Sequence, residues 1–99
     1  MAPKSFRNIN DPAAITRARS VGLKSKTPSS QVYPALIDRL EDTDPVVRLA
    51  AFEELRKDTG QTLGYRPWAG DGERSSAVSR WRSWWKQRQV GLSRFGRNP

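Results

Sequence analysis

The stretch at 44–55, DPVVRLAAFEEL, constrains the fold of this chain more than any other part of it. Asp44 can accept a backbone N–H bond as an N-cap, and Pro45 suits the first helical position, where no donor is needed. An apolar run at 35–40 precedes this start signal, and the polar turn 41–43 separates the two. The sequence therefore predicts two short helices that fold back on each other. Hairpins of this kind usually stack and bind partners.

Apolar residues at helical spacing place the first helix of the hairpin at 30–41, where Ser29 or Ser30 can cap it. The second helix is predicted at 45–58, and Gly60 suits the left-handed position that ends a helix. The expected core positions of this second helix are Val47, Ala50, Ala51 and Leu55.

A third helix is predicted at 71–89, with Asp71 as its cap and Gly91 as its stop. One stripe about 120° wide holds its apolar residues, which are Ala77, Val78, Trp81, Trp84 and Trp85. We interpret this stripe as core that covers the open side of the hairpin, because large rings supply the apolar area that a small hairpin lacks. The alternative is that Trp84, at the edge of the stripe, contacts a partner. The loop at 61–70 is expected to lie over the hairpin through Leu63, Tyr65 and Trp68.

The net charge of +8 is distributed unevenly along the 99 residues. Residues 1–28 carry six Lys/Arg and one Asp, residues 29–72 carry five against eight Asp/Glu, and residues 73–99 carry seven against one Glu. The central segment is therefore acidic and both flanks are basic. Basic flanks either keep a chain soluble as solvated tails or attract an anionic partner such as nucleic acid, an acidic protein or a lipid surface.

Three segments follow from these patterns. Residues 1–28 form a basic arm, mostly unstructured, in which Pro12 can start a short helix over 11–21. Residues 29–90 form the helical domain, and residues 91–99 form a basic tail. The predicted fold class is all-α, and no clear repeat precedes the hairpin.

Several classes of function are excluded or disfavoured by composition. The chain has no Cys and no His, which excludes disulfides, Cys/His zinc sites, thiol nucleophiles and Ser–His catalysis. The acidic set at the hairpin turn lacks the Gly and terminal Glu of a calcium loop, and consists of Asp38, Glu41, Asp42 and Asp44. We expect no metal, no cofactor and no catalytic activity. The sequence shows no secretory signal and no membrane span, so a cytoplasmic location is expected.

The hairpin residues resemble a single HEAT repeat, of the bacterial type also found in phycobilisome-lyase-related proteins. The matching positions are an Asp-Pro turn followed by Val-Arg, a small residue and Leu, namely Asp44, Pro45, Val47, Arg48, Ala51 and Leu55. The resemblance implies that Asp44 and Arg48 help neighbouring repeats to stack. The closing element after some bacterial HEAT repeats resembles the segment from Thr59 to Trp85, and includes Trp81 and Trp85. The similarity covers roughly residues 31–89.

These observations predict a non-catalytic module that binds an unidentified protein partner through a face of the hairpin or through a tail. Self-association is a further expectation, since one repeat buries little apolar surface. The rival prediction is non-specific nucleic-acid binding by the basic third helix and the tails. The candidate contacts for a partner or for phosphate are Arg74, Arg80, Arg82, Trp84, Lys86 and Arg88.

Overall fold

The predicted all-α fold is confirmed by the computed structural model, which describes residues 6–23 and 27–97, with side chains up to residue 90 except that of Arg7. Two short 3-10 helices, η1 (Phe6–Asn10) and η2 (Val21–Leu23), flank α1 (Ala14–Ser20). Three longer helices follow, which are α2 (Ser29–Arg39), α3 (Pro45–Thr59) and α4 (Asp71–Arg97). The described ranges contain no strand.

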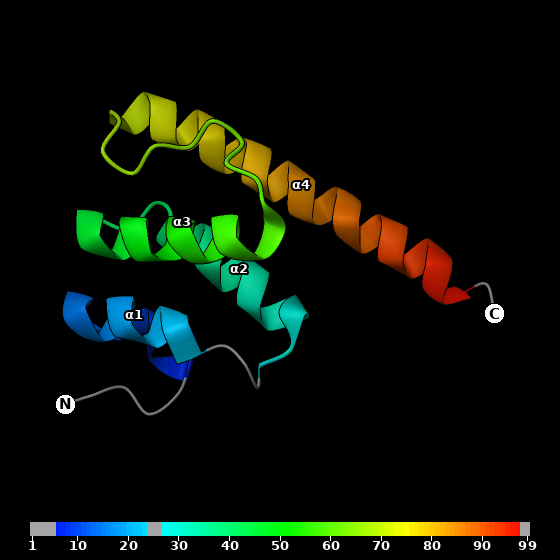
Figure 1. Cartoon of the computed structure of the whole chain (residues 1–99), viewed down its shortest axis with the longest axis horizontal. Helices are drawn as coiled ribbons and strands as arrows, with labels where there is room; N and C mark the ends of the chain where they lie inside the picture. Colours follow the sequence, from blue (N-terminus) through cyan, green and yellow to red (C-terminus); the bar gives the residue numbers. More distant parts are fainter. Residues whose placement is uncertain (1–5, 24–26, 98–99) are drawn as a thin grey trace.

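Three of the helices run in the same direction as one layer (Figure 1). In that view α1, α3 and α4 are stacked from bottom to top, and α2 runs back behind them. Helix α1 packs on α3, and α2 packs on both α3 and α4. The C-terminal part of α4 extends beyond the rest of the molecule (Figure 1). The predicted hairpin, α2 and α3, is therefore flanked on both sides.

Local signals explain where α3 begins and ends. The Asp44 carboxylate accepts a hydrogen bond of 2.8 Å from the Val46 amide, and Pro45 is the first residue of the helix. Both are predicted features of a helix start, since a proline needs no backbone partner there. Gly60 ends the helix with a φ of 72°, in the left-handed region that glycine enters without strain. The predicted boundaries of this helix are confirmed to within one residue.

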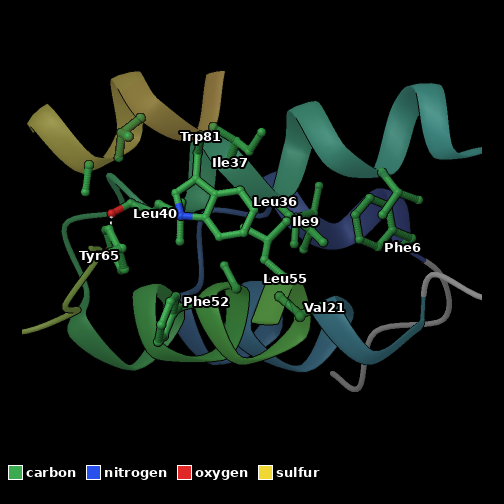
Figure 2. Packing of buried hydrophobic residues seen from close by; sticks show 14 residues of the cluster. Phe6, Ile9, Val21, Leu36, Ile37, Leu40, Phe52, Leu55, Tyr65 and Trp81 are labelled. Carbon is green, nitrogen blue, oxygen red and sulfur yellow. Dashed lines mark hydrogen bonds between the residues drawn. The ribbon is translucent and has the colours of Figure 1, made fainter. Parts of the chain in front are cut away.

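Trp81 lies at the centre of a single apolar core (Figure 2). Its indole is fully buried between α4 and the hairpin, and its Nε1 donates a hydrogen bond of 3.2 Å to the Thr62 carbonyl. The core takes residues from η1, η2, α2, α3 and α4 and from the segments between the helices: Phe6, Ile9, Val21, Val32, Leu36, Ile37, Leu40, Ala51, Phe52, Leu55, Tyr65, Ala77, Val78 and Trp81. The interpretation of the tryptophan stripe as core is confirmed at Trp81.

The basic arm is more ordered than the sequence predicts. The expected short helix is present as α1, but η1 and η2 extend the helical structure over residues 6–23. Phe6, Ile9 and Val21 are buried in the core, and both α1 and η2 pack on α3. The sequence predicted no segment packed on the hairpin from its N-terminal side, and residues 6–23 provide one. The prediction of a mostly unstructured arm is therefore wrong for these residues. Arm residues 1–5 and 24–26 and tail residues 98–99 lie outside the described residues.

Three smaller predictions are also corrected. Helix α2 has Pro28 at its N-cap position and no side-chain cap, so neither Ser29 nor Ser30 caps it. Helix α4 does not stop at Gly91, because its backbone stays helical to Arg97 through most of the predicted tail. Trp68 does not lie over the hairpin, since 75% of its surface is exposed, whereas Tyr65 is buried as expected.

Candidate interaction surfaces

Asp42 is the polar centre of the molecule, where α1, α2 and α3 meet. Its carboxylate is almost completely buried and accepts two hydrogen bonds from Arg17, at 2.8 and 2.9 Å. Arg39 donates a third at 3.1 Å, and the Asp44 backbone amide donates a fourth at 2.9 Å. A buried carboxylate with this many donors is stabilised in its charged form.

The geometry of Arg17 and Asp42 determines the electrostatics of this pair. Burial by itself would raise the pKa of Asp42, but the hydrogen bonds from Arg17 and the Asp44 amide, with the charges of Arg17 and Arg39, outweigh it. The pKa of Asp42 is therefore lowered below its ordinary value. The hydrogen bond to Asp42 likewise raises the pKa of the Arg17 guanidinium. The pair is charged at neutral pH and joins the arm to the hairpin turn.

An arginine recurs as the fourth residue of each helix in the layer. Arg17 in α1 donates through one terminal nitrogen to the carbonyls of Asp11 and Pro12, at 2.8 and 2.9 Å. Arg48 in α3 donates in the same way to the carbonyls of Asp42 and Thr43, at 2.8 and 3.3 Å.

The third helix of the layer carries part of the same pattern. Arg74 in α4 donates to the carbonyl five residues before it, that of Ala69. In α1 and α3, Arg17 and Arg48 also bond a carbonyl five residues earlier. The three helices therefore start in a similar way.

An apolar patch lies on the outer surface of α1 and α3. Ile15 is the second residue of α1 and Val46 the second residue of α3, and their exposed fractions are 58% and 59%. They line one shallow depression of about 130 Å³, together with Ala14 and Asp44. Leu49, which is 43% exposed, follows on α3. Paired exposed apolar side chains at one depression are typical of an interaction surface.

Trp68 is a second exposed apolar group, on an anchored loop. The neighbouring Pro67 is buried, and its carbonyl accepts a hydrogen bond of 2.8 Å from Arg48. The chain at Trp68 is thus fixed to α3 while the indole faces solvent. A large aromatic side chain held in this way loses little conformational entropy on binding.

The exposed edge of the tryptophan stripe forms an aromatic cluster with α2. Trp84 and Trp85 are half-buried, and their rings lie 5.6 and 5.2 Å from that of Tyr33. The Arg88 guanidinium lies 5.7 Å from the Tyr33 ring and 5.4 Å from the Trp84 ring, within the range of cation–π attraction. These contacts hold Trp84 and Arg88 on one side of α4.

The basic residues predicted to contact phosphate or a partner do not form one ridge. Arg74 pairs with Asp71, and Arg82 pairs with Asp38 of α2 and with Glu41 of the turn that follows α2. The Nε of Arg80 donates a hydrogen bond of 2.7 Å to the Leu63 carbonyl. Lys86 is exposed and makes no ion pair in the described part of the chain. The structure thus brings Arg80, Trp84 and Arg88 near each other and directs Arg74 and Arg82 toward internal partners.

The residues singled out for repeat stacking lie mainly inside the protein. Val47, Ala51 and Leu55 are fully buried, and Arg48 is buried with three carbonyl partners. These residues join α3 to the segments around it. Asp44 caps its own helix and lines the depression beside Val46.

Sequence reasoning missed three features of these surfaces: the partner of Asp42, the exposure of Ile15 with Val46, and the anchoring of Trp68. The sequence holds no signal for these three, but it does hold one for the similar helix starts, because Asp11 and Asp42 each precede an arginine by six residues. Each accepts a bond from the amide two residues later, at 2.8 Å from Ala13 and 2.9 Å from Asp44. That correspondence would have aligned Arg17 with Arg48.

Comparison of the chain with protein-family models, curated proteins and solved structures finds no match. In the described ranges, no cluster of three or more carboxylates is arranged to hold a metal ion. None of the helices there combines the length and apolar character needed to cross a membrane.

Proposed function

We propose that this protein is a non-catalytic interaction module of the HEAT-repeat type, which binds a protein partner on the outer surface of α1 and α3. The observation that carries this proposal is the position of Ile15 and Val46. Each is the second residue of its helix, each is more than half exposed, and together they line one depression.

The repeated helix starts support the comparison with repeat proteins. Arg17 and Arg48 bond the carbonyls before their own helices in the same way, and Arg74 repeats part of the pattern. Stacked units of this kind present extended surfaces to partners. The buried groups Asp42 and Arg48 and the partly buried Arg17 all bond within the fold, which supports a structural role for them rather than catalysis.

Apolar contact at this patch would be reinforced by the exposed Trp68. Partner binding usually depends on a few aromatic or aliphatic anchors that become buried at the centre of an interface. Trp68 and Val46 both belong to segments fixed through the first turns of α3, since Arg48 holds Pro67. The proposed surface is therefore rigid before a partner arrives, which reduces the entropic cost of association.

Val46→Glu tests this surface, because a charge there opposes apolar contact and is compatible with the first turn of a helix. The matched control is Val90→Glu, which places the same charge on another exposed valine, on α4. Proteins retained from an extract by wild-type protein would be identified and then reconstituted from purified components.

We expect a purified partner to bind wild-type protein and Val90→Glu, and its binding to be lost in Val46→Glu. Sedimentation of the purified chain decides whether the partner is a second copy. A partner that still binds Val46→Glu as well as wild type would overturn the surface assignment.

A further inference from the structure

A groove runs along α4 on the side of the loop that precedes it. It has a volume of about 500 Å³ and opens widely to solvent. The loop contributes Gln61 and Leu63, and α4 contributes the remaining residues of the lining, which are Ser79, Arg80, Ser83, Trp84 and Gln87. The lining thus combines an aromatic ring, a guanidinium, amides and hydroxyls, and none of the seven residues is acidic.

The loop wall of this groove is held in a strained conformation. Leu63 has a φ of 51° and is the one non-glycine residue with a positive φ in the described ranges. Its carbonyl accepts the bond from the Arg80 Nε at 2.7 Å, and the Trp81 indole bonds the preceding Thr62 carbonyl. A bulky residue in the left-handed region is an outlier, and such residues concentrate at functional sites.

Gly64 lets Arg80 lie against this turn. Gly64 has a φ of 75°, and a Cβ added to it would lie 2.8 Å from a terminal nitrogen of Arg80. Any other residue would therefore push the guanidinium away from the loop. The turn and Arg80 form one fixed wall, and the Arg80 side chain is exposed to solvent.

Trp84 forms the aromatic part of the lining and is held from behind. Its ring meets that of the buried Trp81 at 5.5 Å and 76°, and that of Tyr33 at 5.6 Å and 82°. Both contacts are edge-to-face, an arrangement that favours aromatic pairs. Trp84 is consequently a preorganised ring, which contributes to the lining of the groove and has the Arg88 guanidinium 5.4 Å from its centre.

The charge around the groove has one sign. From Arg74 to the C-terminus the sequence holds seven Lys/Arg and no Asp/Glu. Arg82 is engaged by Asp38 and Glu41, whereas Arg80 and Arg88 have no carboxylate partner in the described ranges and Lys86 is exposed. Cations beside an aromatic ring, without carboxylates, favour a polyanion that carries flat rings.

We propose that this groove binds single-stranded nucleic acid, with an unpaired base against Trp84 and the phosphates near Arg80, Lys86 and Arg88. Base stacking on an aromatic platform and phosphate contact with cations give affinity with little sequence preference. A duplex hides the faces of its bases, so stacking on Trp84 requires a single strand. This activity is separate from the protein-binding surface on α1 and α3.

The test measures the fluorescence anisotropy of a labelled oligothymidylate at low salt with two matched variants. Ser83→Asp places a carboxylate in the groove, and Ser75→Asp places the same charge on α4 outside the lining, where no cation lies three or four residues later. Both serines are exposed, so neither change removes core packing. Ser83→Asp is expected to weaken binding about tenfold or more, and Ser75→Asp by about twofold or less.

A third variant separates stacking from simple charge attraction. Trp84→Leu keeps an apolar side chain but removes the ring, and is expected to weaken binding by about fivefold or more in a protein whose helical circular dichroism is unchanged. If Trp84→Leu alters the circular dichroism, the comparison of Ser83→Asp with Ser75→Asp decides the proposal.

Three outcomes would overturn the proposal. They are equal effects of Ser83→Asp and Ser75→Asp, equal affinity for a duplex of the same length, and binding to phosphatidylserine vesicles or polyglutamate but not to the oligonucleotide. The Val46→Glu variant is expected to bind the oligonucleotide like wild type, so failure here leaves the protein-binding proposal intact.

Discussion

Arg17 of the N-terminal arm binds the buried carboxylate of Asp42 through two hydrogen bonds, at 2.8 and 2.9 Å. The two residues are far apart in sequence, and their pairing attaches α1 to the turn between α2 and α3. Paired donors from one guanidinium to one carboxylate are among the strongest side-chain hydrogen bonds. The arm is therefore a structural part of the helical domain.

Replacement of Arg17 by methionine should destabilise the protein by about 3 kcal/mol, because it leaves a buried carboxylate short of its main partner. Arg39 and the Asp44 amide still bond Asp42, which keeps the loss at the lower end of the range for broken buried pairs. Urea unfolding followed by circular dichroism measures the change. Arg19→Met is the control, because Arg19 is exposed on the same helix. Equal unfolding midpoints for the two variants would contradict the role of the pair.

Stability should also fall in acid because of Asp42. Its pKa is lowered in the folded state, so the folded protein favours the charged carboxylate. The contribution is present above the pKa of an unfolded aspartate, about 3.9, and is lost as the pH falls through the lower folded value. Thermal melts from neutral pH to about pH 2 should show this loss. In Arg17→Met, stability should fall less steeply with acid than in wild type. An equally steep fall would argue against Asp42 as its source.

Tyr65→Phe should cost about 1–3 kcal/mol, because the buried hydroxyl donates a hydrogen bond of 2.5 Å to the Leu40 carbonyl. Burial raises the pKa of Tyr65 to about 12. The folded state thus favours the neutral phenol, and its contribution holds below about pH 10 and is lost as the pH rises toward the folded value. Alkaline melts of wild type and Tyr65→Phe measure both effects. Tyr33→Phe is the control. It retains Tyr65, so its stability should fall at alkaline pH as that of wild type does.

The two tryptophans at opposite extremes of burial should respond differently to truncation. Trp81→Ala removes a fully buried ring from the centre of the core and should cost about 3–5 kcal/mol. Trp68→Ala removes a ring that is 75% exposed and should change stability by less than about 0.5 kcal/mol. Chemical unfolding of both variants compares the effects. Similar losses would show that the loop at Trp68 contributes to the core.

Periodicity and turn chemistry were sufficient to predict the three main helices and most of the core. Asp44, Pro45 and Gly60 mark the ends of α3 because caps depend on residues within one turn of each other. The α4 stripe predicted Ala77, Val78 and Trp81 as core, since helical spacing determines which side chains share a face. The end of α4 was missed because Gly91 only weakens a helix, and does not break it as proline would.

The candidate surfaces were less predictable than the core. Val46 is apolar in sequence and could have been buried by a neighbouring repeat, yet α1 contacts α3 in a way that leaves it beside Ile15 in solvent. The basic residues of α4 also looked equivalent in sequence. Only the placement of α2 shows that Arg82 pairs with Asp38 and Glu41.

The sequence by itself determined the all-α class, the start and end of α3 and the buried stripe of α4, because these depend on residues within a few positions of one another. The tertiary structure decided the pairing of Arg17 with Asp42, the exposure of Val46 and Trp68, and the groove at Trp84. Those features join segments distant in the chain. Their geometry depends on how whole helices pack, and side-chain spacing along one helix carries no information about that arrangement.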